Sequence, residues 1–163
     1  MHVRVATTAD VNSGIWSSVK ALPLHTTTNV RVEAFGRDVF LFLNNTFDSM
    51  TTVSANRISG EASLYISDPW YAPAVADIGS IKMESISALS ISGTSGIFNG
   101  RISKYAVYES TTVPPNFSLS FSIKPHENFS DWTNIIHYSG DQSDLGTRGR
   151  MPGTSFKNFF HRL

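Results

Sequence analysis

Hydrophobic and polar residues alternate strictly along several short stretches of this chain. In the segment 117–123 (FSLSFSI), apolar residues occupy every second position and serines occupy the positions between them. A period of two places the apolar side chains on one face of a β-strand. The segment 29–35 alternates in the same way. Both segments are therefore predicted to be half-buried strands.

Further segments are rich in aliphatic, β-branched or aromatic residues and are bounded by turn-forming residues. They are 38–43, 46–54, 62–67, 78–86, 102–108 and 132–138. Short strands that recur about every 8–12 residues are typical of antiparallel sandwiches. The pattern predicts an all-β fold made of two antiparallel sheets.

Two short turns connect the strands near the middle of the first half. Gly36-Arg37 separates 29–35 from 38–43 and predicts a β-hairpin. Asn44-Asn45 is a second turn signal, because asparagine tolerates the left-handed conformation. The run 38–43 is apolar at both alternating sets of positions, which predicts a central strand covered on both faces.

Evidence for helix is confined to one place near the start of the chain. Ile15, Val19 and Leu22 have helical spacing, but Gly14 and Pro23 enclose a short stretch. A single helical turn there is an alternative to irregular structure.

Composition and charge narrow the classes of function. The chain has 163 residues, the size of one domain, and is 40% hydrophobic, which is enough for a buried core. Thirteen basic side chains balance thirteen acidic ones. Zero net charge disfavours a nucleic-acid partner bound by phosphate neutralisation. The absence of cysteine excludes disulfide scaffolds, zinc-thiolate sites and cysteine nucleophiles.

Membrane and export signals are not evident in the pattern. No apolar run reaches the ~18 residues that a membrane span requires, so we expect no membrane span. Residues 1–10 (MHVRVATTAD) lack the apolar core of a signal peptide. Either no export route is encoded, or this chain is part of a longer protein whose signal lies elsewhere.

Three segments of the sequence resemble segments of the laminin-G-like, concanavalin-A-like lectin jelly-roll superfamily. Residues 30–44 are similar to a hairpin of that fold, and the resemblance implies that Phe47 and Asp48 after it are displayed. Residues 62–71 are similar to its closing strands, and residues 117–125 to its early strands. The resemblance implies an antiparallel two-sheet sandwich of the jelly-roll type.

These segments occur along the chain in the reverse of the order found in the family. Residues 1–86 resemble the closing half of a laminin-G-like sandwich, and residues 101–150 resemble the opening half. The Ser/Gly-rich segment 87–100 is interpreted as a linker, and 151–163 as a divergent tail. The chain is then either a circularly permuted or truncated sandwich, or a fragment that spans two tandem repeats.

The resemblance implies a non-enzymatic module for carbohydrate binding or adhesion, extracellular or attached to a surface. Its expected partner is a glycan or glycoprotein surface contacted by loops at the rim of the sandwich. A structural repeat of a larger surface, matrix, appendage or virion assembly is the alternative. In that case sheet edges and apolar loops would meet neighbouring subunits or further copies of the chain.

A calcium ion is a possible cofactor of such a rim. Laminin-G-like domains often hold one calcium ion there, and hard oxygen ligands suit that ion. The loop 139–146 contains two carboxylates, Asp141 and Asp144, among glycines. Aspartate and glycine also form turns, so turn chemistry is the alternative explanation for this loop.

Exposed aromatic side chains are the second candidate for ligand contact. Trp70 and Tyr71 follow Asp68-Pro69, where the strand pattern ends. Aromatic rings in loops are suited to recognition surfaces, including the faces of sugars. We therefore expect Trp70, Tyr71 and Asp68 to contact the ligand; the alternative is that Trp70 closes the open end of the core.

A glycan-cleaving enzyme is disfavoured. Retaining glycosidases need two carboxyl groups about 5 Å apart, which residues two apart on one strand can supply. No two acidic residues of this chain are two positions apart. The histidines show no metal-binding spacing, and no serine-nucleophile or phosphate-loop motif is present.

Overall fold

The computed structural model describes residues 1–10, 13–15, 17–66, 72–85, 90–91, 96–98, 106–127, 133–140 and 153–156. These residues form β-strands and the turns and loops between them. No helix is found within these ranges, and the described residues 17–22 do not form the helical turn considered above. Within the described ranges there is also no helix that could cross a membrane.

The described strands form two sheets. We call the first the β13 sheet. In spatial order it contains β11 (Ala106–Val113), β6 (Gly60–Ile66), β13 (Thr133–Ser139), β14 (Gly153–Phe156), β1 (His2–Val5) and β2 (Ser13–Ile15), with the short β7 (Ala72–Pro73) beside β13. All of its pairings are antiparallel except the parallel pairing of β7 with β13.

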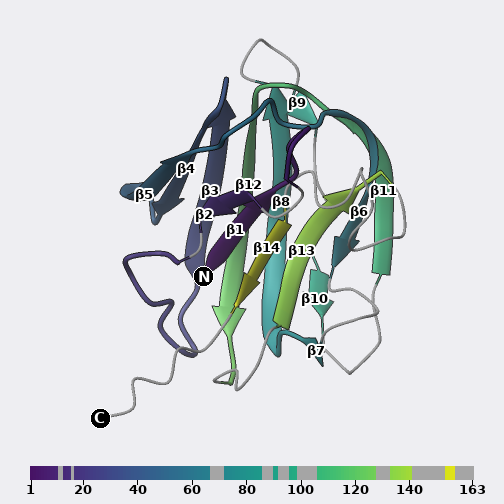
Figure 1. The fold of residues 1–163 in the computed structure, drawn as a ribbon. Coiled ribbons are helices and arrows are strands. Elements are labelled where there is room, and N and C mark those ends of the chain that lie inside the picture. Colours follow the sequence, from purple (N-terminus) through teal and green to yellow (C-terminus); the bar gives the residue numbers. More distant parts are fainter. Residues whose placement is uncertain are drawn as a thin grey trace.

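The second sheet, which we call the β12 sheet, is antiparallel throughout. In spatial order it contains β10 (Gly96–Phe98), β8 (Ala76–Ser85), β12 (Phe117–Pro125), β3 (Thr28–Phe35), β4 (Asp38–Leu43) and β5 (Thr46–Thr52), with the short β9 (Ser90–Ile91) beside β8. Figure 1 shows the two sheets lying one over the other.

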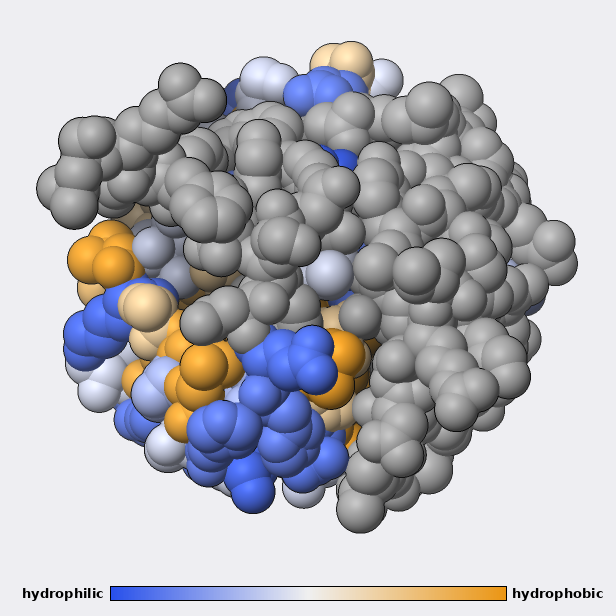
Figure 2. All heavy atoms as spheres, turned by 90° about the horizontal axis from the view of Figure 1, so that it is seen from below, coloured by the Kyte–Doolittle hydropathy of each residue, from blue (hydrophilic) through white to orange (hydrophobic). Residues whose placement is uncertain are grey.

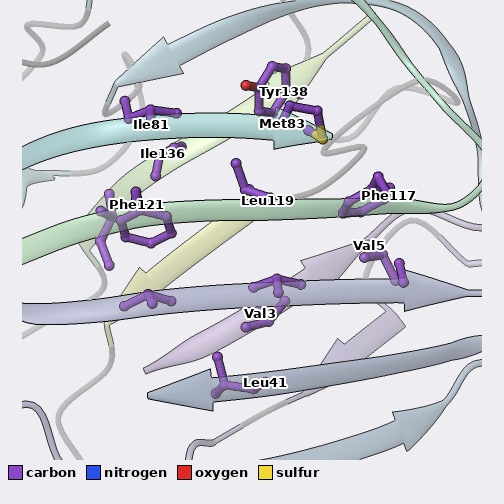
Figure 3. Packing of buried hydrophobic residues seen from close by; sticks show 14 of the residues in the cluster. Val3, Val5, Leu41, Ile81, Met83, Phe117, Leu119, Phe121, Ile136 and Tyr138 are labelled. Atoms are coloured by element: carbon purple, nitrogen blue, oxygen red, sulfur yellow. The ribbon is translucent and has the colours of Figure 1, made fainter. Parts of the chain in front are cut away.

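The core lies between the two sheets. Phe117, Leu119 and Phe121 on β12 are at most 2% exposed, as the alternation of this segment predicted. They point toward Ile136 and Tyr138, which come from β13 (Figure 3). The all-β architecture with antiparallel sheets is thus confirmed, and its layers form a sandwich-like core.

Both sheets contain strands from the two halves of the sequence. β12 lies between β3 and β8, and β13 pairs with β6. In the segment interpreted as a linker, the described residues 90–91 and 96–98 pair with β8. In the segment interpreted as a tail, β14 lies between β13 and β1. The two halves therefore share the same two sheets.

The turns of the β3–β4–β5 meander have the predicted chemistry. Asn44 and Asn45 both have positive φ, 50° and 60°, which is the pattern of a type I′ hairpin turn. Gly36 has a φ of 54° at the first position of the preceding turn. Glycine adopts that value without the steric cost that a Cβ atom would add.

One expectation about this region is wrong. The strand 38–43 was expected to be covered on both faces, but only its inward side chains, Val39, Leu41 and Leu43, are buried. Phe40 and Phe42 point the other way and are only partly buried. Apolar residues on both faces of a strand therefore did not indicate a second covering layer.

Arg57 forms hydrogen bonds with two turns that are far apart in the sequence, the turn at Gly36 and the turn at Pro115-Asn116. Its Nε donates to the carbonyl of Gly36 at 3.0 Å, and its Nη2 donates to the carbonyl of Pro115 and to Oδ1 of Asn116. Asn116 Oδ1 also accepts the backbone N–H of Gly36 at 2.9 Å. The guanidinium lies 5.4 Å from the ring centre of Phe117, and burial lowers the pKa of Arg57.

We predict that Arg57→Ala lowers the free energy of unfolding by about 1–2 kcal/mol, because it removes hydrogen bonds of a charged donor to two turns. Arg37→Ala is the matched control, since Arg37 makes one exposed contact with Ser54. The control is expected to cost less than about 0.5 kcal/mol. Urea unfolding of both variants measures the difference; equal midpoints would contradict the role given to Arg57.

Candidate functional site

The outer face of the β12 sheet carries two rows of side chains that cross five strands. Strand register places them side by side, from β8 through β12, β3 and β4 to β5. The first row consists of Lys82, Ser120, Arg31, Phe42 and Phe47. The second row consists of Glu84, Ser118, Glu33, Phe40 and Met50. Each row thus runs from a charged end to an apolar end.

The apolar end of the rows is accessible to solvent. Together with Phe35, which lies two residues beyond Glu33 on β3, we call it the outer patch; its members are Phe35, Phe40, Phe42, Phe47 and Met50. Phe35, Phe47 and Met50 are 60%, 52% and 48% exposed. Side chains of this kind on a folded surface mark sites that meet another molecule when they are contiguous.

Ring contacts order the outer patch. The rings of Phe42 and Phe47 meet edge to face, with centres 6.0 Å apart and an angle of 75° between their planes. The guanidinium of Arg31 lies 4.0 Å from the ring centre of Phe42. Both are favourable geometries for an aromatic ring. These contacts favour the observed positions of the Phe42 and Phe47 rings.

The charges of the rows are paired along the strands. Arg31 forms an ion pair with Glu33, and Lys82 forms one with Glu84. In each pair the two residues are two apart on one strand, so their side chains lie on the same face. The rows as a whole therefore carry no net charge.

A β-bulge in β5 sets the directions of the Phe47 and Asp48 side chains, shortly after the Asn44-Asn45 turn. Leu41 pairs with Ser49 while the next residue, Phe42, pairs with Phe47, so Asp48 is the extra residue. The bulge lets Phe47 point outward beside Phe42 while Asp48 points inward.

Asp48 is a structural residue. The resemblance implied that Phe47 and Asp48 are both displayed; Phe47 is exposed, but Asp48 is only 8% exposed. Its carboxylate accepts the backbone N–H groups of Val19 and Lys20, each at 2.8 Å, and the hydroxyl of Ser49 at 2.8 Å. The expectation for Asp48 was wrong because the bulge turns its side chain toward the loop before β3.

A second polar cluster lies where β12 ends. His126 Nε2 is 3.0 Å from Asp77 Oδ2, and the His25 and His126 rings have centres 5.9 Å apart. The end of the molecule seen from below shows hydrophilic side chains next to hydrophobic ones among its described residues (Figure 2). No group of three or more histidine and acidic side chains in the described ranges is arranged to hold a metal ion.

The ligand and calcium residues predicted from the sequence lie outside the described residues. Asp68, Trp70 and Tyr71 belong to the segment between β6 and β7, and Asp141 and Asp144 to the segment between β13 and β14. These assignments stay predictions. The outer patch was not predicted, although the apolar residues at both sets of positions in 38–43 were a signal for it.

Comparisons of the chain with protein-family models, curated proteins and solved structures return no match. The fold itself defines the class, an all-β protein of two mainly antiparallel sheets with an exposed aromatic surface.

We predict that Asp48→Ala lowers the free energy of unfolding by about 2–4 kcal/mol, because two backbone N–H groups lose a charged acceptor in a buried place. Asp38→Ala is the control: Asp38 accepts the hydroxyl of Thr52 in an exposed place, and its loss should cost about 0.5 kcal/mol. Thermal and urea unfolding measure both. An Asp48 variant as stable as the control would show that the loop 17–20 does not depend on this carboxylate.

Proposed function

We propose that this chain is a non-enzymatic carbohydrate-binding or adhesion module that binds its ligand on the outer face of the β12 sheet. The observation that carries the proposal is the outer patch, where aromatic rings are ordered by contacts and still exposed. An aromatic face offers apolar contact area without a large entropy cost, since phenylalanine has few rotatable bonds. A sugar ring presents a matching face of C–H groups.

The charge pattern favours a neutral ligand. Arg31 and Glu33 are paired with each other, so neither is an unpaired counter-ion for a sulfate or carboxylate group. Their remaining hydrogen-bonding capacity, with the hydroxyls of Ser118 and Ser120 beside them, suits the hydroxyl groups of a neutral sugar. A neutral oligosaccharide lying along the rows would meet apolar rings at one end and polar groups at the other.

Rim loops are a second part of this proposal. The laminin-G-like resemblance still favours Trp70, Tyr71 and Asp68 as contacts, and Asp141 and Asp144 as ligands of calcium. The same resemblance favours an extracellular or surface-attached location. A structural repeat in a larger assembly is the second candidate, and it is favoured by the opposite charges that the two rows carry at corresponding positions of β3 and β8.

Removal of the exposed side chains should weaken ligand binding while the fold is kept. We expect Phe47→Ser combined with Met50→Ser to weaken binding to neutral glycans on an array, and in calorimetry with the best of them, by about tenfold or more. Val19→Ser is the matched control, because Val19 is an exposed apolar residue on a loop outside the patch, 79% exposed. The control should bind like the unaltered protein.

Two results would count against the glycan proposal. One is a flat response of the unaltered protein to every sugar on the array. The other is undiminished binding by the double variant, which would move the ligand away from the outer patch.

Calcium is tested separately. If Asp141 and Asp144 bind calcium, calcium titration should raise the melting temperature, and Asp141→Asn with Asp144→Asn should abolish that rise. Asp10→Asn serves as the control. Heat release in calorimetry that is unchanged in the double variant would assign the ion to other residues.

A further inference from the structure

The two rows on the outer face have opposite charge at corresponding positions. On β3, Arg31 belongs to the first row and Glu33 to the second; on β8, Lys82 belongs to the first row and Glu84 to the second. On β12 the corresponding positions are both serine. On β4 and β5 they are both apolar. Every position in one row thus has a complementary position in the other.

A two-fold axis can use this complementarity. Consider a two-fold axis just above the outer face of the sheet. It is perpendicular to the strands, parallel to the two rows, and midway between them. Rotation by half a turn then lays a second copy face down on the first and exchanges the rows while keeping the order of strands. Arg31 of one copy meets Glu33 of the other, and Lys82 meets Glu84. Such an isologous contact is the commonest arrangement in homodimers.

The remaining positions of the rows also match under this rotation. Ser118 faces Ser120, and the small serines let the two sheets approach at β12, between the two charged strands β8 and β3. Phe42 faces Phe40, and Phe47 faces Met50. Each apolar side chain therefore meets an apolar partner. Aligned sheets cross at about 30°, so the match is best near the middle strands and loosens toward the ends.

We propose that the outer face of the β12 sheet is a self-association surface, on which a second copy of this chain docks about that two-fold axis. Each charged side chain keeps its partner on its own strand and gains one of opposite sign from the other copy. Arg31 and Glu33 of the two copies then form a group of four alternating charges, and Lys82 and Glu84 form another. Such groups determine the orientation and register of a contact, and they contribute less to its affinity. A copy docked in the opposite sense would place like charges together.

The contact is expected to be weak. Stable interfaces bury about 800 Å² on each partner and involve about 20–30 residues a side. The two rows and Phe35 supply only about half that number of residues. We therefore expect dissociation constants on the order of 100 µM and rapid exchange between monomer and dimer. A glycan on the outer patch would compete with the second copy, although the self-association surface does not depend on glycan binding.

The test is a pair of charge-reversed proteins. In the acidic variant, Arg31→Glu is combined with Lys82→Glu; in the basic variant, Glu33→Arg is combined with Glu84→Lys. Sedimentation velocity of the unaltered protein without sugar should show dimers that increase with concentration. Each variant alone should self-associate at least tenfold more weakly. An equal mixture of the two should form dimers again.

Controls separate this contact from general charge attraction. Glu61→Lys reverses an exposed charge on β6 of the β13 sheet and should leave the dimer unchanged. Phe47→Ser placed in both charge variants should weaken the mixed dimer. Circular dichroism confirms that each variant folds. If the mixture stays monomeric, or if Phe47→Ser has no effect on it, the proposal is overturned.

A dilution series of the unaltered protein, followed by amide NMR shifts, needs no variant. Concentration-dependent shifts should cluster on β3, β4 and β12. Shifts confined to the edge strands β5 or β11 would indicate that copies pair edge to edge, and this would overturn the proposal. A protein that remains monomeric at millimolar concentration would overturn it as well. Because no sugar is present, a monomer that binds glycans would refute only the self-association surface, and a dimer that binds none would refute only the glycan proposal.

Discussion

The structure depends on the burial of one apolar face of β12 against the facing sheet. Phe117, Leu119, Phe121 and Ile123 are nearly inaccessible to solvent, and each is worth about 1.5–3 kcal/mol when removed from water. Within its own sheet β12 also joins the two halves of the sequence, because it pairs with β3 on one side and β8 on the other. The register of the whole β12 sheet follows from it, since a slip of one residue would expose every one of these side chains.

The same register creates the outer face. Once the apolar residues of β12 point inward, its serines point outward, and the pairings carry this division across β3 and β8. β4 and β5 depart from it because Phe40, Phe42, Phe47 and Met50 make most of their outward face apolar as well. The bulge at Asp48 then serves two purposes with one extra residue: it keeps Phe47 beside Phe42 and turns a carboxylate toward backbone N–H groups.

Strands whose two faces differ in polarity were predictable from the sequence. The segments 29–35 and 117–123 alternate, and both are strands within one residue or two of the predicted bounds. The segment 102–108 was less regular; its described residues, 106–108, belong to β11, which continues to Val113. β1 and β14 were missed because four-residue strands are too short for a period of two to stand out from chance. Asp48 was misjudged because a bulge depends on how two strands pair, which the pattern within one strand does not contain.

The pairing of β1 with β14 has a consequence for how the protein is made. His2 pairs with Ser155, so β1 has a neighbour that is synthesised much later than β1 itself. Until that neighbour leaves the ribosome, one edge of β1 lacks its final hydrogen-bonding partner. Contacts between residues so distant in sequence slow folding, because a long loop must close before they form. This sheet therefore cannot be completed until β14 has been synthesised, and the nascent chain would benefit from protection by chaperones in that interval.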